Sequence, residues 1–281
     1  MSRIGLIVVT IFVCGGLMLS SAAHAIHGPR FESDKSFVNR MFRLYSTAPR
    51  IKMSRVYGGI VTHHIPDGIP LMAQFYSKVK KNLNPRTIII LAPDHVDAGK
   101  YGISISEEDF VTPFGKLSSS GDMVKKILRT GLAGVSEKPF ELDHSIHSQM
   151  LLISKYFPKA KVVPIVFRSS ISVEDGRTFG SMLSGLVDSS TFIVASIDFA
   201  HYLEKNKSRA IDNQSAALLQ TINPRLAGLV EADSPQALSA FMAAMSTLGA
   251  NKSEAMGVFN SGDFGNNQTS TTGYVVKFFG R

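Results

Sequence analysis

The chain has 281 residues, 44% of them apolar, with 30 Lys and Arg against 22 Asp and Glu and a formal net charge of +8. The apolar content excludes wholesale disorder, and the lack of a second long apolar stretch after the first 25 residues excludes a bundle of membrane-spanning helices. The basic residues lie singly or in short groups at helix-like spacing among apolar residues. This spacing indicates solvated helix faces and argues against a nucleic-acid-binding stripe.

Residues 1–25 are predicted to be a secretory signal peptide. Arg3 precedes an apolar stretch that runs from Ile4 to Leu19, and Ala23-His24-Ala25 forms a small-x-small cleavage signature. The stretch is shorter than the roughly 20 residues that a spanning helix needs, so an uncleaved anchor is the alternative. Lipid attachment at Cys14 is a further alternative, although Val13 stands where a lipoprotein would have a small residue.

Cleavage after residue 25 would leave an exported protein, periplasmic or secreted, with no stable insertion into the membrane. Cys14 is the only cysteine and would leave with the signal peptide, so the mature protein could form no disulfide. Residues 26–50 lack clean periodicity and are predicted to wrap around the surface. Residues 51–281 are predicted to form one domain.

Short β-branched runs alternate with amphipathic stretches along this domain, which is the pattern of an α/β fold whose central mixed sheet is covered by helices. Strands are predicted at Val56–Thr62, Thr87–Leu91, Ile103–Ile105, Lys161–Phe167, Thr191–Ala195 and Thr272–Phe279. Helices are predicted at Leu71–Asn82, Asp122–Thr130, Asp143–Tyr156, Val173–Val187, Ser208–Ile222 and Ser234–Leu248. Asn260–Thr272 is predicted to be a loop before the final strand.

Histidines gather in four short segments. Three of these segments directly follow predicted strands and carry His63 with His64, His95 and His201, while His144 and His147 begin a predicted helix. Loops after the carboxyl ends of strands line the ligand crevice of open α/β sheets, so a pocket lined by histidines is expected. Imidazole suits metal binding or proton transfer, and neighbouring carboxylates can orient it. The carboxylates beside these histidines are Asp94, Asp143 and Asp198.

Contiguous catalytic motifs do not explain these histidines. The sequence has no HEXXH zinc-protease motif, no GXSXG elbow, no Walker loop and no GXGXXG fingerprint. A cysteine nucleophile is excluded once Cys14 has left with the signal peptide. The functional groups must therefore come together through the fold.

Six landmarks between about residues 56 and 279 occur in the order found in the Memo family, the AmmeMemoRadiSam system protein B group. The chain resembles this family in a loop matching Pro-His-Ala-Gly, a Gly-Pro-Asn/Ser-His loop, a Thr-Pro-Leu/Phe-Gly turn, an acid-His-Ser-Ile helix start, a Ser-Ser-Asp-x-x-His segment and a closing Ser-Gly-Asp turn with a Gly-Tyr strand. The matching segments are His63-His64-Ile65-Pro66, Ala92-Pro93-Asp94-His95, Thr112-Pro113-Phe114-Gly115, Asp143-His144-Ser145-Ile146, Ser196-Ile197-Asp198-Phe199-Ala200-His201, Ser261-Gly262-Asp263 and Gly273-Tyr274.

The resemblance implies a fold like that of the class III extradiol dioxygenases and a metal bound by two histidines and a cysteine. The histidines carry over to His64 and His95, with His63 as the alternative to His64. The cysteine position falls on Asp233, and two imidazoles with a carboxylate favour non-haem Fe(II), although Zn or Cu would also bind. Other candidates for the third ligand are Glu254, Asp94 and His201. The competing interpretation of Asp233 is favourable placement at the positive end of a helix dipole.

The resemblance further implies an oxidoreductase of the extradiol type that acts on a small aromatic or other oxygen-bearing substrate. In that reaction His201, held by Asp198, would be the general acid or base, and His144 would donate a hydrogen bond to bound oxygen or substrate. Two other functions stay open. One is a metal- or peptide-binding module without turnover, and the other is a zinc hydrolase on the same ligands.

Overall fold

The computed structural model describes residues 26–28, 30–265 and 267–281. The predicted signal peptide, with the alternatives of an uncleaved anchor and of lipid attachment at Cys14, lies outside the described residues. Among the residues that are described, no helix combines the length and apolar character needed to cross a membrane.

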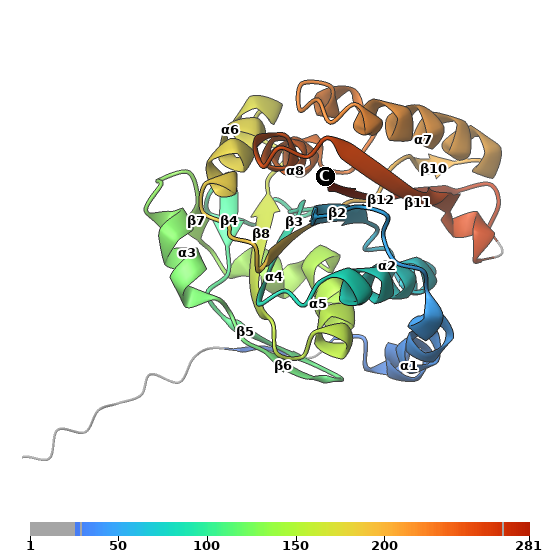
Figure 1. The fold of residues 1–281 in the computed structure, drawn as a ribbon, viewed down its shortest axis with the longest axis horizontal. Coiled ribbons are helices and arrows are strands. Elements are labelled where there is room, and N and C mark those ends of the chain that lie inside the picture. The colour runs from blue at the N-terminus through green and yellow to red at the C-terminus, as the bar shows by residue number, and fades with distance from the viewer. Residues whose placement is uncertain (1–25, 29, 266) are drawn as a thin grey trace, which may run out of the picture.

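A central sheet of nine strands forms the middle layer of the fold (Figure 1). Its strand order is β10-β12-β2-β9-β3-β8-β4-β7, and β11 pairs with β12 outside this path. Neighbouring strands are parallel from β2 through β9 and β3 to β8, and antiparallel where β12 meets β2 and where β4 meets β8. The strands span Val56–Val61 (β2), Thr87–Pro93 (β3), Ile103–Ile105 (β4), Gly134–Val135 (β7), Lys161–Phe167 (β8), Thr191–Ser196 (β9), His201–Leu203 (β10), Lys252–Asn260 (β11) and Thr271–Gly280 (β12).

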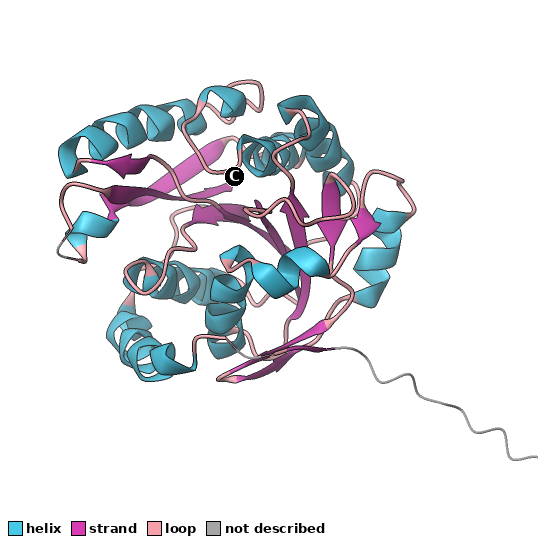
Figure 2. Cartoon of the chain, turned by 180° about the vertical axis from the view of Figure 1, so that it is seen from behind, coloured by secondary structure: helices cyan, strands magenta, loops and turns pink. Residues whose placement is uncertain are grey.

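Helices cover both faces of the sheet (Figures 1 and 2). The helices α1, α2 and α5 pack on one face, and α3, α6 and α8 contribute buried residues to the other. Strands buried on both faces read as continuous apolar runs, which is why every residue of β3 and β8 after the first, Thr87 or Lys161, is apolar. The helices span Lys35–Leu44 (α1), Ile69–Asn82 (α2), Gly121–Leu128 (α3), Lys138–Leu142 (α4), Ser145–Tyr156 (α5), Val173–Ser184 (α6), Lys205–Gln220 (α7) and Pro235–Thr247 (α8).

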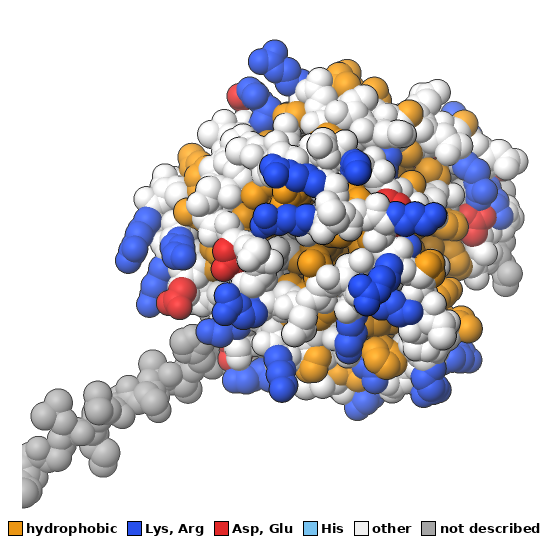
Figure 3. Space-filling view, viewed as in Figure 1, with side chains coloured by type: hydrophobic (Ala, Val, Ile, Leu, Met, Phe, Trp, Pro, Cys, Tyr) orange, Lys and Arg blue, Asp and Glu red, His pale blue; other side chains and the backbone are white. Residues whose placement is uncertain are grey.

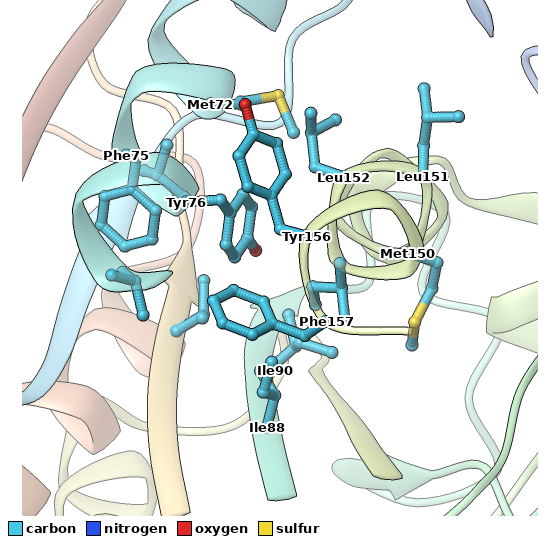
Figure 4. Packing of buried hydrophobic residues seen from close by; sticks show 14 of the residues in the cluster. Met72, Phe75, Tyr76, Ile88, Ile90, Met150, Leu151, Leu152, Tyr156 and Phe157 are labelled. Atoms are coloured by element: carbon cyan, nitrogen blue, oxygen red, sulfur yellow. The ribbon is translucent and has the colours of Figure 1, made fainter. Parts of the chain in front are cut away.

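The core between α2, α5 and the sheet is rich in aromatic residues. Tyr76 of α2 lies beside Tyr156 and Phe157 at the end of α5, with ring centroids 6.1 and 6.3 Å away (Figure 4). Phe75 of α2 stacks on Phe278 of β12 with ring centroids 4.7 Å apart. These contacts fix α5 against the sheet, and the beginning of α5 carries part of the histidine cluster described below.

The N-terminal segment 26–50 is joined to this core. Its first strand, β1 (Ile26–His27), pairs with β5 (Asp109–Thr112) in a small sheet completed by β6 (Gly115–Leu117). Its helix α1 packs on α2 and buries Val38 and Met41. Short 3-10 turns span Glu32–Asp34, Tyr45–Thr47, Ala227–Leu229 and Ser261–Asp263.

The fold class predicted from the sequence, one α/β domain with a central mixed sheet covered by helices, is confirmed. All six predicted strands and all six predicted helices are present, with ends that differ by up to three residues. Lys and Arg side chains are spread over the face seen in Figure 3, with neutral and hydrophobic groups between them.

Candidate metal centre

Three neighbouring parallel strands deliver polar side chains to one edge of the sheet. The adjacent strands β2, β9 and β3 end at Val61, Ser196 and Pro93. His63, Asp198 and His95 each lie two positions beyond the end of their strand. Because parallel strands end at the same edge, these side chains meet although they are far apart in the sequence.

Asp233, in the loop before α8, joins them from the other side. Its backbone N–H donates to the carbonyl of Asp198 over 3.0 Å, and the backbone N–H of Asp198 donates to its Oδ2 over 3.2 Å. The next residue, Ser234, caps α8 by accepting a hydrogen bond from the backbone of Ala237. Asp233 is thus held by both the strand end and the helix start.

The two imidazoles converge on one carboxylate oxygen. Asp233 Oδ2 lies 3.1 Å from His63 Nε2 and 3.5 Å from His95 Nε2. The three potential ligand atoms lie within 4.8 Å of one another. The side chains of His63 and Asp233 are 2% and 6% exposed and that of His95 is 31% exposed, so the group is open to solvent on one side only.

Hydrogen bonds fix which nitrogen of each imidazole faces this group. His63 Nδ1 donates to the backbone carbonyl of Ser196 over 3.1 Å, since a carbonyl can only accept. His95 Nδ1 bonds to Asp143 Oδ2 over 2.9 Å, and the His95 backbone N–H donates to the same carboxylate. Both rings therefore present Nε2 toward Asp233, the arrangement in which a second hydrogen bond orients a metal-binding histidine.

The same contacts shift the pKa values of the two histidines and of Asp233. Burial lowers the pKa of His95, but its hydrogen bonds with Asp143 and Asp233 outweigh burial and raise the pKa to about 10. Burial acts against His63 in the same way, and the charges of Asp198 and Asp233 raise its pKa. Burial would raise the pKa of Asp233, but His63 and His95 hold it at about 2. The group thus combines an ionised carboxylate with two imidazoles whose pKa values are raised.

One atom of this group has no partner. Asp233 Oδ1 is buried and makes no hydrogen bond with any described residue. Leaving a buried carboxylate oxygen unsatisfied costs about 1–3 kcal/mol or more. A cation bound by both carboxylate oxygens of Asp233 and by the Nε2 atoms of His63 and His95 would satisfy Oδ1, so the residues present fit a bound metal ion.

A cavity of about 550 Å³ opens beside the three ligands. His144 lines it, with its ring centroid 5.2 Å from that of His95 and 5.4 Å from that of His63. Burial and the charge of His63 lower the pKa of His144, which favours its neutral form. His201 lines the cavity too, and its ring lies within 4.8 Å of the carboxylates of Asp198 and Asp233.

Several residues predicted from the sequence lie elsewhere or have other partners. His64 lines the cavity but hydrogen-bonds through Nδ1 to the Tyr274 hydroxyl, and the structure places His63 in the converging group instead. Asp94 accepts hydrogen bonds from the backbone of its own loop. Glu254, on β11, pairs with Lys78 over 3.2 Å.

Asp198 does not hold His201 in the way the sequence suggested. Its Oδ1 accepts hydrogen bonds from the Thr62 hydroxyl and the His63 backbone. His201 makes no hydrogen bond to it in the described part of the chain. Asp198 therefore braces the loop that carries His63, because the end of β9 lies beside the end of β2.

Two features of the site could not be settled from the sequence. His63 was only the alternative to His64, and it lies in the converging group because the turn after β2 directs it toward Asp233. Asp143 was assigned to the adjacent His144, whereas its closest imidazole partner is His95. No sequence signal links Asp143 to His95, because their contact depends on the packing of α5 against β3.

The comparisons with known proteins identify the family. A model of the Memo-like protein family matches residues 22–277. The chain belongs to the Memo-like family. A MEMO1 family protein of Nitrosopumilus maritimus is 29% identical over 238 residues, covering 79% of this chain and 84% of that protein. A MEMO1 family protein of Pyrobaculum arsenaticum is 27% identical over 243 residues, covering 81% of this chain and 84% of that protein.

The Memo-like fold also has a more distant structural counterpart. The solved structure of the uncharacterized protein JW3007 of Escherichia coli K12 superposes with a TM-score of 0.56 at 14% identity, covering 79% of this chain and 99% of that chain. At that identity the likeness concerns the fold alone. The chain is therefore a Memo-like protein with buried His and Asp clusters arranged so that they could hold a metal ion.

Proposed function

We propose that this Memo-like protein is a metal-dependent oxidoreductase that holds Fe(II) on His63, His95 and Asp233. The observation that carries the proposal is the convergence of two Nε2 atoms on Asp233 Oδ2 while Asp233 Oδ1 is buried without a partner in the described residues. Two imidazoles and one carboxylate are the ligand set of non-haem Fe(II) oxygenases. The carboxylate stands where the resemblance to the Memo family implies a cysteine.

When bound, the ion would supply Lewis-acid and redox chemistry toward O₂ and an oxygen-bearing substrate. Side chains of the protein would accept and donate the protons of the reaction. His144 is favoured as the group that accepts a proton from the substrate, because its lowered pKa keeps it neutral and its side chain makes no hydrogen bond to a described residue. His201 faces the same cavity and would exchange a proton at a second position.

The cavity supports a small polar substrate. Its volume of about 550 Å³ is within the range of small-molecule sites. Its lining is rich in histidine and carboxylate, with Tyr202 at the rim 83% exposed. A catechol or another compound with two adjacent oxygens would fit these groups better than an apolar ligand. An apolar ligand would displace water from the polar lining without replacing its hydrogen bonds.

We further propose that the protein works after export, with residues 1–25 removed. Export would place the site outside the cytoplasm, where it would meet a substrate that comes from the surroundings of the cell. Amino-terminal sequencing of protein recovered from the periplasm should begin at Ile26. A terminus at Met1 in the membrane fraction would support the uncleaved anchor instead.

The test begins with metal content. Protein purified without oxygen and loaded with Fe(II) should bind the ion, and His63→Ala, His95→Ala and Asp233→Ala should each lose one equivalent. His64→Ala is the matched control, because the neighbouring histidine lines the same cavity yet lies outside the ligand group, and it should retain the ion. Loss of the ion in His64→Ala with retention in His63→Ala would overturn the assignment.

Turnover is tested separately by oxygen uptake with a panel of catechols. Consumption of O₂ that depends on Fe(II), His144 and Asp233 would support the oxidoreductase. Stoichiometric Fe(II) binding without uptake would leave a binding module without turnover. Hydrolysis of ester substrates by the zinc-loaded form alone would identify a zinc hydrolase on the same ligands.

A further inference from the structure

His64 lies in the wall of the histidine-lined cavity but outside the proposed metal centre. It belongs to none of the described groups of side chains that could hold an ion. Its backbone is fixed on both sides, because its N–H donates to the Thr62 hydroxyl over 3.0 Å and its carbonyl accepts the N–H of Gly68 over 2.8 Å. The loop after β2 therefore holds one more imidazole at this cavity than the proposed ion uses.

Tyr274 of β12 fixes the orientation of this imidazole. Its hydroxyl bonds to His64 Nδ1, and the two ring centroids lie 5.9 Å apart. Tyr274 is fully buried, and burial raises the pKa of its hydroxyl well above the usual range, so the hydroxyl keeps its proton. A buried hydroxyl proton needs an acceptor. The bond to His64 is therefore part of the internal structure of the protein.

A chain of hydrogen bonds decides the direction of the bond between Tyr274 and His64. The side chain of Ser261 also bonds to the Tyr274 hydroxyl, and its Oγ accepts the backbone N–H of Thr272 over 3.0 Å. The Ser261 hydroxyl has no other acceptor among the described residues, so it donates its proton to Tyr274. Tyr274 then donates to His64 Nδ1, which places the proton of the imidazole on Nε2.

The Nε2 atom of His64 is the free end of this chain. It makes no hydrogen bond with any described residue and is not sealed from solvent. Because the ring lines a cavity of about 550 Å³, its Nε2–H group is open to a molecule bound there. A donor that is already held in place loses little freedom when the ligand arrives, which favours binding.

The charges around this donor allow an acceptor that carries negative charge. Two carboxylates line the cavity, Asp198 and Asp233, and the divalent ion of the proposed function would balance them. Asp67 and Asp263 lie near Tyr274 but do not line the cavity. Asp263 is also held in ion pairs with two basic side chains. An anionic oxygen beside His64 would therefore face no uncompensated carboxylate across the cavity.

We propose that His64 determines substrate specificity by donating its Nε2–H to an acceptor oxygen, such as a carboxylate, that lies outside the reach of the metal ion. This inference rests on the proposed function, because it concerns the substrate of the same cavity. The substrate would carry this oxygen in addition to the two adjacent oxygens proposed above. Hydrogen bonds to charged acceptors are the stronger ones, so a carboxylate would be favoured over a neutral group. Tyr274 is a positioning residue that acts through His64.

The test compares the dissociation constants of 3,4-dihydroxybenzoate and catechol, measured by calorimetric titration without oxygen on the full protein loaded with Fe(II). The preference for the carboxylate probe should fall by about tenfold in His64→Ala, which should retain the ion. His64→Gln should recover part of the preference, because its amide N–H can reach the position of Nε2. The same preference in the wild type and in His64→Ala would overturn the proposal.

Tyr274→Phe tests the positioning role, because it removes the hydroxyl and keeps the buried ring. Nitrogen NMR should show His64 as the Nε2–H tautomer in the wild type and as a mixture of tautomers in this variant, with a reduced preference for the carboxylate probe. Tyr156→Phe is the matched control, since the hydroxyl of this buried tyrosine has no partner among the described residues. It should change neither result. An unchanged tautomer in Tyr274→Phe would refute the positioning role.

Failure of this inference and failure of the proposed function are distinguishable. Asp233→Ala keeps His64 and Tyr274 without the proposed ion, so a preference for the carboxylate probe that depends on His64 in this background supports the inference even if the wild type binds no Fe(II). Fe(II) binding with a preference that is insensitive to His64 would overturn the inference alone and leave His64 as the acceptor for the buried Tyr274 hydroxyl. Absence of binding by both probes would overturn it as well.

Discussion

Asp233 decides the chemistry of the main site at the scale of single residues. A carboxylate at this position makes the ligand set entirely nitrogen and oxygen, whereas a thiolate would favour softer ions. Its unpartnered Oδ1 and its contacts with His63 and His95 place all the negative charge of the ligand group on this one side chain. Substitutions here should therefore change which ion binds as well as how tightly.

Asp233→Cys tests this role. The variant should still bind one equivalent at the site, with its preference shifted toward softer ions, because the thiolate replaces the carboxylate between the same two imidazoles. Loading with Co²⁺ should then produce a thiolate charge-transfer band that the wild type lacks. Asp233→Ala is the control and should show neither the band nor the bound ion. An unchanged spectrum for Asp233→Cys would place the third ligand elsewhere.

Asp143→Asn tests the orientation of His95. The amide keeps the size of the side chain but removes the charge that holds the imidazole. Metal affinity should fall by about 10- to 100-fold, the usual effect of removing such a hydrogen-bond partner. Isothermal titration measures the change, and Asp122→Asn, at an exposed acid on α3, should leave affinity unaltered. Equal affinities for the two variants would contradict the assigned role.

The buried Asp212 on α7 should make the free energy of unfolding depend on pH, whether or not a metal ion is bound. Burial raises its pKa to about 6, and its carboxylate accepts the backbone N–H of Ala200. Since this pKa exceeds the unfolded value, the stability that the protonated group contributes is fully present below about pH 4 and is lost as pH rises through about 6. Urea unfolding of the wild type should show this loss, on the order of 2–3 kcal/mol, and Asp212→Asn should remove it. The same slope in both proteins would refute the assignment.

At the scale of secondary-structure elements, the packing of α6 on α8 depends on two glycines. A Cβ atom on Gly180 would lie 1.9 Å from the carbonyl oxygen of Ala240, and one on Gly176 would lie 2.3 Å from that of Gln236. The backbones of the two helices therefore lie close together where these glycines have no side chain. Since Asp233 lies just before α8, this packing also helps to fix the third proposed ligand.

Gly180→Ala should destabilise the protein by about 2–3 kcal/mol, because the added methyl group forces the two backbones apart. Gly185→Ala is the matched control at the end of the same helix, where a Cβ would lie 3.4 Å from its nearest neighbour, the carbonyl oxygen of Met182. Its effect should stay within about 1 kcal/mol and could be stabilising. Chemical denaturation compares the two, and equal losses would contradict the proposed close contact.

Elements were predictable where the sequence pattern and burial agree. The strands at Ile103–Ile105 and Lys161–Phe167 are found with the predicted ends, because each is rich in Ile or Val and is followed directly by a polar residue, Ser106 or Arg168. The strand β11 was missed because its residues are half exposed along one edge, so no apolar alternation marks it. The N-terminal helix α1 was not predicted, although Phe37, Val38, Met41 and Phe42 recur at helical spacing.

The candidate site likewise has parts that could be predicted from the sequence and parts that could not. The histidine-bearing loops could be predicted because they follow predicted strands, and Asp233 could be predicted from the family resemblance. The choice between His63 and His64 could not, because it depends on which side chain the turn after β2 directs inward. The contact of Asp143 with His95 arises from helix packing and leaves no local signal.

At the scale of the whole molecule, metal binding should be coupled to folding. The proposed ligands of the main site come from β2, β3 and the loop before α8, so they converge only in the folded state. Free metal at 100 times its dissociation constant should stabilise the protein by about 2.7 kcal/mol, and a chelator should lower the melting temperature. The variant Asp233→Ala should melt at one temperature with and without chelator. A chelator effect that persists in this variant would point to ligands outside the group of His63, His95 and Asp233.

The pairing of β12 with β2 has a consequence for when the ion can enter. β2 carries His63 at its end and lies between β9 and β12, and β12 is the last strand of the chain. The strand β2 therefore acquires its second neighbour only after all of the chain between Val61 and Thr271 has been synthesised, and contacts between such distant segments form late. Metal loading would follow this pairing, so the ion would be drawn from whichever compartment the chain folds in.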